Sequence, residues 1–106
     1  MKTAQEYIES IKNLNLEHYM CGEKVNSAVD NPILRPSLNS VMMTYELAEK
    51  PEYEDLMTAT SHLTGKRINR FTNIHQSTED LVKKVKMQRL LGQKTCACFQ
   101  RCVGMD

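Results

Sequence analysis

Three cysteines lie close together near the end of the sequence, and their spacing is the pattern best able to support chemistry. Cys98 and Cys102 are four residues apart, which on a helix places both thiols on one face with Cβ atoms about 5–6 Å apart. Thiolates are soft ligands that suit iron–sulfur clusters, zinc or copper(I). Cys96 would point about 200° away from Cys98 on the same helix. The pattern therefore favours Cys98 and Cys102 over Cys96 as metal ligands.

A metal site built on this pair would be incomplete. Structural zinc and 4Fe–4S clusters each need four ligands, and no second Cys or His pair lies at zinc-finger spacing. The other interpretation is that the cysteines are small buried apolar residues, which the spacing alone favours. Disulfides are not indicated, because the chain carries no secretory signal.

The remaining candidates for chemistry are scattered. His18, His62 and His75 have no partner at ligand spacing, so we expect surface or capping roles for them. Residues 65–67 (Gly-Lys-Arg) lack the upstream glycine of a phosphate-binding loop. The lysines of residues 83–86 are more typical of a solvated helix face than of a phosphate clamp.

Caps, prolines and apolar periodicity predict a mainly α fold for a single domain of residues 1–106. Thr3 and Glu6 have the form of a capping box, and apolar residues recur behind them at helical spacing. The expected elements are a helix over residues 4–14, a loop or short extended piece over 16–25, a helix from Pro36 to Pro51, a short helix over 52–57 and an irregular or hairpin-like stretch over 58–73.

The last helical region is expected to begin at Ser77, with acidic residues in its first turn. Gly92 has the character of a stop or kink, after which Gln93 to Val103 would form one more helix that carries the cysteines. The predicted buried stripe consists of Leu81, Val82, Val85, Leu90 and Leu91.

Composition and charge narrow the class of protein. With 41% hydrophobic and 25% charged residues, and with no apolar run of membrane-spanning length, a cytoplasmic protein is the default prediction. Residues 1–65 carry a net charge of −5 and residues 66–106 carry +6. The basic half can face the phosphates of a nucleotide or CoA, or the two halves can be solvated faces that partly neutralise each other. Nucleic acid is disfavoured, because no reader motif is present.

Four stretches carry a resemblance that runs through nearly the whole chain. They are EYIESIKNLN, RPSLNSVMMTYELA, GKRINRFTNIHQSTEDLVKKVKMQRLLGQKT and CFQRCVGMD. The sequence resembles the N-terminus of the 4-hydroxybutyryl-CoA dehydratase/vinylacetyl-CoA Δ-isomerase family, within the 4-hydroxyphenylacetate 3-hydroxylase-like flavoproteins. The chain also stops soon after its most chemical-looking segment, so we expect a piece of a longer polypeptide that is inactive alone.

The resemblance implies an acyl-CoA-dehydrogenase-like architecture in a homotetramer. It further implies FAD and a 4Fe–4S cluster held by cysteines and one histidine. Such an enzyme dehydrates 4-hydroxybutyryl-CoA to crotonyl-CoA, and isomerises vinylacetyl-CoA, by a radical mechanism in 4-aminobutyrate fermentation. An iron of the cluster acts as a Lewis acid on the leaving hydroxyl.

Carried over to this chain, the resemblance makes Cys98 and Cys102 of the CFQRC motif cluster ligands and leaves Cys96 out. Gln100 is expected to contact the substrate site, and Arg89 to meet a phosphate or the flavin, with a surface salt bridge as the alternative for Arg89. Two other functions stay open. A flavin-dependent 4-hydroxyphenylacetate 3-monooxygenase would not need the cysteine pair, and a non-enzymatic helical interaction module would need no cofactor.

Overall fold

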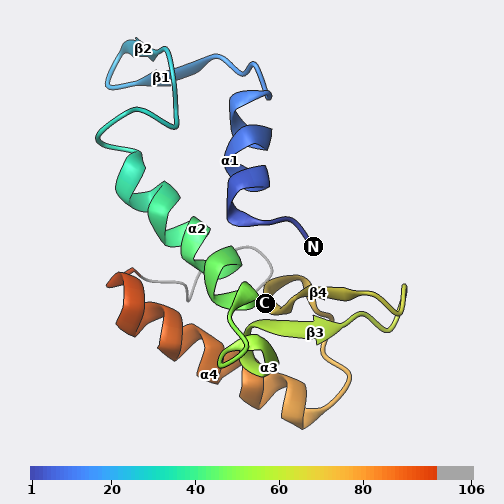
Figure 1. Ribbon diagram of the computed structural model, residues 1–106. Coiled ribbons are helices and arrows are strands. Elements are labelled where there is room, and N and C mark those ends of the chain that lie inside the picture. Colours follow the sequence, from blue (N-terminus) through green and yellow to red (C-terminus); the bar gives the residue numbers. More distant parts are fainter. Residues whose placement is uncertain (98–106) are drawn as a thin grey trace.

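The computed structural model describes residues 1–97, in which helices dominate and two small sheets of two strands each are added (Figure 1). In chain order the elements are α1 (Ala4–Lys12), β1 (His18–Met20), β2 (Glu23–Val25), α2 (Arg35–Glu49), α3 (Glu54–Met57), β3 (Thr58–Thr60), β4 (Arg67–Asn69), the 3-10 turn η1 (Arg70–Thr72) and α4 (Thr78–Thr95). Among these helices, none combines the length and apolarity that crossing a bilayer requires.

Side-chain caps begin α1 and α4 as the sequence predicts. The Thr3 hydroxyl accepts a hydrogen bond from the Glu6 backbone N–H at 3.2 Å, and the Glu6 carboxylate accepts one from the Thr3 N–H at 2.8 Å. The bond from the Thr3 backbone lowers the pKa of the Glu6 carboxyl. Ser77 caps α4 by accepting a bond from the Asp80 N–H at 3.2 Å. The helix predicted to end at residue 14 ends at Lys12, within ordinary uncertainty for a helix terminus.

Both stretches that lack a helical period contain antiparallel hairpins. β1 pairs with β2 across Cys21 and Gly22, whose φ angles of 52° and 84° form a tight turn. β3 pairs with β4, so that Thr58 lies opposite Asn69. The extended and hairpin-like character predicted for these two stretches is confirmed.

The end of α4 differs from the prediction. The helix continues through Gly92 to Thr95, so neither a stop at Gly92 nor a separate helix starting at Gln93 occurs. α4 ends at Cys96, whose φ of 55° is left-handed and whose N–H donates to the Gly92 carbonyl at 2.9 Å. A left-handed residue at this position turns the chain out of the helical path.

The core lies where the second half of α2 meets α3 and α4. Its buried members are Leu47, Ala48, Met57, Met87 and Leu91. The buried stripe predicted for α4 is therefore wrong in part, because Leu81, Val82 and Val85 are exposed. Lys84 is buried instead, since it shares the face of Met87 and Leu91 at the helical spacing of three and four residues.

Candidate functional site

The predicted ligands Cys98 and Cys102, and the predicted contact residue Gln100, lie outside the described residues. What the structure gives is the path of the chain toward them. Ala97 packs against the core, and its N–H donates to the Thr95 hydroxyl at 3.2 Å. A Cβ added at Gly92 would lie 3.7 Å from the Ala97 carbonyl oxygen, so the chain folds back over the last turn of α4. The CFQRC motif is thus entered from a turn anchored on the core.

The turn at Cys96 changes the helical geometry that was expected to direct Cys96 away from Cys98. Cys96 is exposed and left-handed, so no helix connects it to Cys98, and the predicted angle of about 200° between them does not apply. Cys96 instead forms the C-cap of α4. Within residues 1–97, no group of three or more His, Cys, Asp or Glu side chains could hold a metal ion.

Arg89 lies on an exposed part of α4. None of the carboxylates in residues 1–97 forms an ion pair with it, so the surface salt bridge considered as an alternative finds no partner there. Its guanidinium group is free to meet a group from outside this region.

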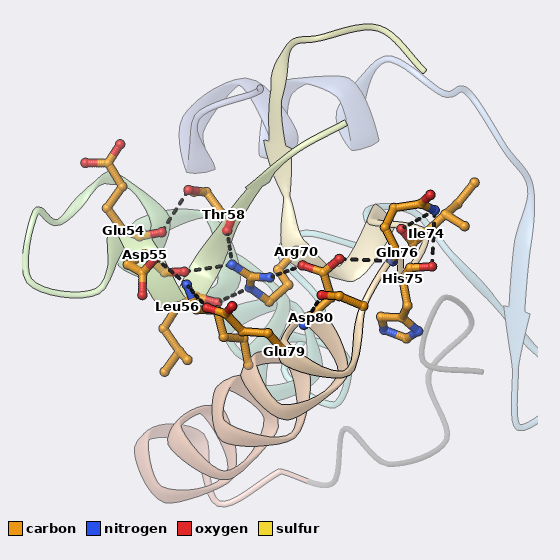
Figure 2. A network of polar contacts seen from close by, with 12 residues as sticks. Glu54, Asp55, Leu56, Thr58, Arg70, Ile74, His75, Gln76, Glu79 and Asp80 are labelled. Atoms are coloured by element: carbon orange, nitrogen blue, oxygen red, sulfur yellow. Dashed lines mark hydrogen bonds and ion pairs between the residues drawn. The ribbon is translucent and has the colours of Figure 1, made fainter. Parts of the chain in front are cut away.

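The histidines lie on separate parts of the chain. His18 is half-buried on β1, and His62 is exposed in the β3–β4 hairpin, which agrees with the surface role expected for His62. His75, in the connection from η1 to α4, is half-buried, and its Nε2 atom is buried without a hydrogen-bond partner among residues 1–97. Figure 2 shows the His75 ring turned away from Arg70.

A buried arginine that the sequence analysis did not single out organises the polar contacts of this region (Figure 2). Arg70 is only 4% exposed. Its Nε–H donates to the Leu56 carbonyl at 2.7 Å, and its Nη2 group donates to the carbonyls of Asp55 and Thr58. These carbonyls come from the end of α3, where a helix leaves acceptors unsatisfied and favours a cation. Arg70 therefore satisfies the end of α3 from inside the fold.

The same guanidinium connects α3 to α4. Arg70 Nη1 lies 3.7 Å from Oδ1 of Asp80, and the other carboxylate oxygen, Oδ2, accepts a hydrogen bond from the Gln76 N–H at 3.0 Å. Nη1 itself is buried and makes no hydrogen bond to the part of the chain that the structure describes. An ordinary arginine in a basic stretch gives no sign of this role, since only the fold brings the three carbonyls to it.

A second link between α3 and α4 is more exposed. Lys83 Nζ lies 2.7 Å from the Asp55 carboxylate and 3.5 Å from that of Glu79. The hydrogen bond from Lys83 lowers the pKa of the Asp55 carboxyl, and the bond to Asp55 raises the pKa of the Lys83 amine. The solvated lysine face predicted for residues 83–86 is therefore wrong for Lys84, which is buried and has a partner, and incomplete for Lys83.

These links border an open groove of about 680 Å³ between α3, β3 and the start of α4. Its charged lining residues are Glu54, Asp55, Glu79, Asp80, Arg67, Arg70 and Lys83. Each of the cations lies near a carboxylate, with Arg67 Nη1 3.3 Å from Glu54. Because the positive charge is already paired, the groove is not suited to a phosphate, and we interpret the polar cluster as structural.

Comparison with known proteins places this arrangement in a family. The profile described as "4-hydroxyphenylacetate 3-hydroxylase N terminal" matches residues 3–106. The 4-hydroxybutyryl-CoA dehydratase/vinylacetyl-CoA-Delta-isomerase of Clostridium aminobutyricum is 66% identical over 106 residues, which are 100% of this chain and 22% of the relative. The oxygenase component of 4-hydroxyphenylacetate 3-monooxygenase from Thermus thermophilus is 28% identical over 94% of this chain and 20% of its own length.

Solved structures agree with the sequences. The oxygen-tolerant archaeal 4-hydroxybutyryl-CoA dehydratase from N. maritimus has a TM-score of 0.88 at 50% identity, covering 98% of this chain and 20% of its own. The oxygenase component of 4-hydroxyphenylacetate 3-monooxygenase complexed with FAD has a TM-score of 0.73 at 26% identity, covering 89% and 19%. The chain thus spans about a fifth of the length of these proteins.

Sequence identity is higher to the two dehydratases, at 66% and 50%, than to the two monooxygenase components, at 28% and 26%. The chain belongs to the 4-hydroxyphenylacetate 3-hydroxylase N-terminal family and, within it, resembles the 4-hydroxybutyryl-CoA dehydratases.

Proposed function

We propose that this chain is the N-terminal helical part of an enzyme that dehydrates 4-hydroxybutyryl-CoA to crotonyl-CoA and isomerises vinylacetyl-CoA. The observation that carries the proposal is the 66% identity to the dehydratase/isomerase of Clostridium aminobutyricum over the entire chain, so that the matched region extends through the CFQRC motif. The complete enzyme would be a cytoplasmic homotetramer of acyl-CoA-dehydrogenase-like architecture that acts in 4-aminobutyrate fermentation.

Within this enzyme Cys98 and Cys102 would bind a 4Fe–4S cluster. Two thiols suit iron–sulfur chemistry, and the turn at Cys96 and the packing of Ala97 against the core anchor the residues directly before the motif. The remaining cysteine and histidine ligands would come from other parts of the polypeptide. When bound, the cluster would supply a Lewis-acidic iron for the leaving hydroxyl, and FAD would supply a one-electron oxidant.

The other predicted site residues serve binding. Gln100, between the two cysteines, would contact the polar end of the substrate. Arg89 would bind a phosphate of the CoA thioester or of FAD, which its exposure and its lack of an ion pair in residues 1–97 allow. FAD is bound by a monooxygenase component of the same fold.

The ligand assignment is tested in the full-length enzyme, purified without oxygen. Cys98→Ala or Cys102→Ala should lower iron and sulfide to a small fraction of wild type and abolish dehydration. Cys96→Ala is the matched control and should keep both, because Cys96 caps α4 at the surface. Loss of iron in Cys96→Ala with retention in Cys98→Ala would show that the ligands are wrongly assigned.

A second candidate is a flavin-dependent monooxygenase, supported by the 28% identity to the Thermus thermophilus component. This function gives the cysteine pair no role. A full-length protein that binds FAD, contains no iron, is unaffected by Cys98→Ala and hydroxylates 4-hydroxyphenylacetate when supplied with reduced flavin would favour the monooxygenase. The 106-residue chain alone should show no dehydration even after iron and sulfide are supplied, since half of the ligands are elsewhere.

A further inference from the structure

α4 is apolar on two sides. One side packs into the core through Met87 and Leu91, which are fully buried. The other presents Leu81, Val82 and Val85, which stay 50%, 45% and 41% exposed. A surface helix of a protein that is complete by itself has one apolar face and one polar face. Apolar residues on both sides are typical of a helix that lies between two layers of structure.

The exposed residues continue into a charged one. Val82, Val85 and Arg89 follow one another at spacings of three and four residues, so they lie on one stripe along the helix. Arg89 is exposed and has no ion pair within residues 1–97. The stripe is therefore apolar over its first two turns and cationic at the turn nearest the cysteines.

The length of the relatives identifies what covers this stripe. The dehydratases aligned with this chain are about five times as long, because it spans 22% and 20% of them. The core of residues 1–97 lies on the opposite face of α4, so this region has nothing to place on the stripe. We infer that the apolar part of this stripe, Val82 and Val85, together with the neighbouring Leu81, is the docking surface for the rest of the same polypeptide.

This inference rests on the proposed function in one respect, that the chain is part of a longer enzyme. Docking would bury Leu81, Val82 and Val85 against an apolar surface of the rest of the polypeptide. It would bring Arg89 to the edge of that interface. It would also fix the direction of α4, whose end leads directly to the CFQRC motif.

The test compares variants of the full-length protein. Val85→Lys and Val82→Lys should lower Tm by about 5 °C or more, because a charge would be buried without a partner. Val85→Thr keeps the shape, adds one hydroxyl, and should show a smaller loss if the lysine variants fail to fold. Leu63→Lys is the matched control and should melt like wild type, because Leu63 is an exposed apolar residue of the β3–β4 hairpin and lies off α4.

Three outcomes separate the possibilities. A lowered Tm that does not depend on protein concentration, with unchanged oligomer size, supports docking within one polypeptide. A wild-type Tm in both Val85 variants overturns the inference. A smaller folded species with a concentration-dependent Tm also overturns it, since a second copy would then cover the stripe. Iron analysis tests the proposed function separately. If the wild-type protein contains no iron but Val85→Lys still lowers its Tm, the proposed function is refuted while the docking surface is supported.

Discussion

Two regions of the described chain are stabilised in different ways: the first half, which runs from α1 to the start of α2, and the second half, which runs from the end of α2 to α4. In the second half, the end of α2, α3 and α4 share five buried apolar residues, and Arg70 ties three carbonyls and a carboxylate to one guanidinium. In the first half, α1 contributes one buried residue, Ile8, and contacts α2 through stacked rings of Tyr7 and Tyr45 with centroids 4.9 Å apart. Figure 1 shows α1 lying alongside α2, and the β1–β2 hairpin near the start of α2, away from α3 and α4.

This difference indicates which half supports the candidate site. The cysteine motif follows α4, which belongs to the well-packed half. The helix that leads to the proposed ligands is therefore anchored in the core. The first half depends on few contacts, and its local unfolding should cost less. Three predictions test this contrast, in order of decreasing effect.

Arg70→Ala should have the largest effect. It leaves the carbonyls of α3 and the Asp80 carboxylate without their buried partner, at a cost on the order of 3–5 kcal/mol. Hydrogen exchange of the full-length protein should speed up in α3 and α4 and stay unchanged in α1. Arg67→Ala is the control, because Arg67 is about half exposed and should matter much less. Equal exchange in Arg70→Ala and wild type would mean that the cluster does not stabilise this half.

The contact between the two tyrosines should matter less, and only for the first half. Tyr7→Leu, Tyr45→Leu and the double variant form a cycle whose coupling energy should be about 0.5–1.5 kcal/mol. The measurement is exchange of the α1 amides, with the α4 amides as internal reference. Strictly additive effects, or a change in α4 as large as in α1, would contradict the proposed division.

The ion pair of Asp55 and Lys83 should have the smallest effect and a defined pH range. The pKa of Asp55 is lowered from 3.8 and that of Lys83 is raised from 10.5, so the pair stabilises the fold fully between these values. Stability is lost as pH falls through the lowered pKa of Asp55, or rises through the raised pKa of Lys83. Asp55→Asn should therefore lower Tm slightly at pH 7 and by less below pH 3. The same difference at both pH values would mean that the carboxylate charge is not responsible.

The sequence by itself determined the local features of the fold. Thr3 and Ser77 begin their helices because a side-chain oxygen next to the first turn needs no distant partner. The two hairpins were predicted as a loop or short extended piece and as an irregular or hairpin-like stretch, but their strand bounds and register were not, because pairing depends on contacts between residues several positions apart. The family was also readable from the sequence, since long stretches of matching residues are specific in themselves.

Tertiary structure alone decided which side of each element faces inward. Apolar periodicity placed Leu81, Val82 and Val85 in the core, but α4 has apolar residues on two faces, and packing against α3 selected the face of Met87. The same packing buries Lys84. The end of α4 was also decided by tertiary contacts, because Gly92 stays helical while Cys96 takes the left-handed turn that returns Ala97 to the core. The role of Arg70 was the least predictable from the sequence. Its guanidinium stabilises the fold only because the chain brings three otherwise unsatisfied carbonyls around it.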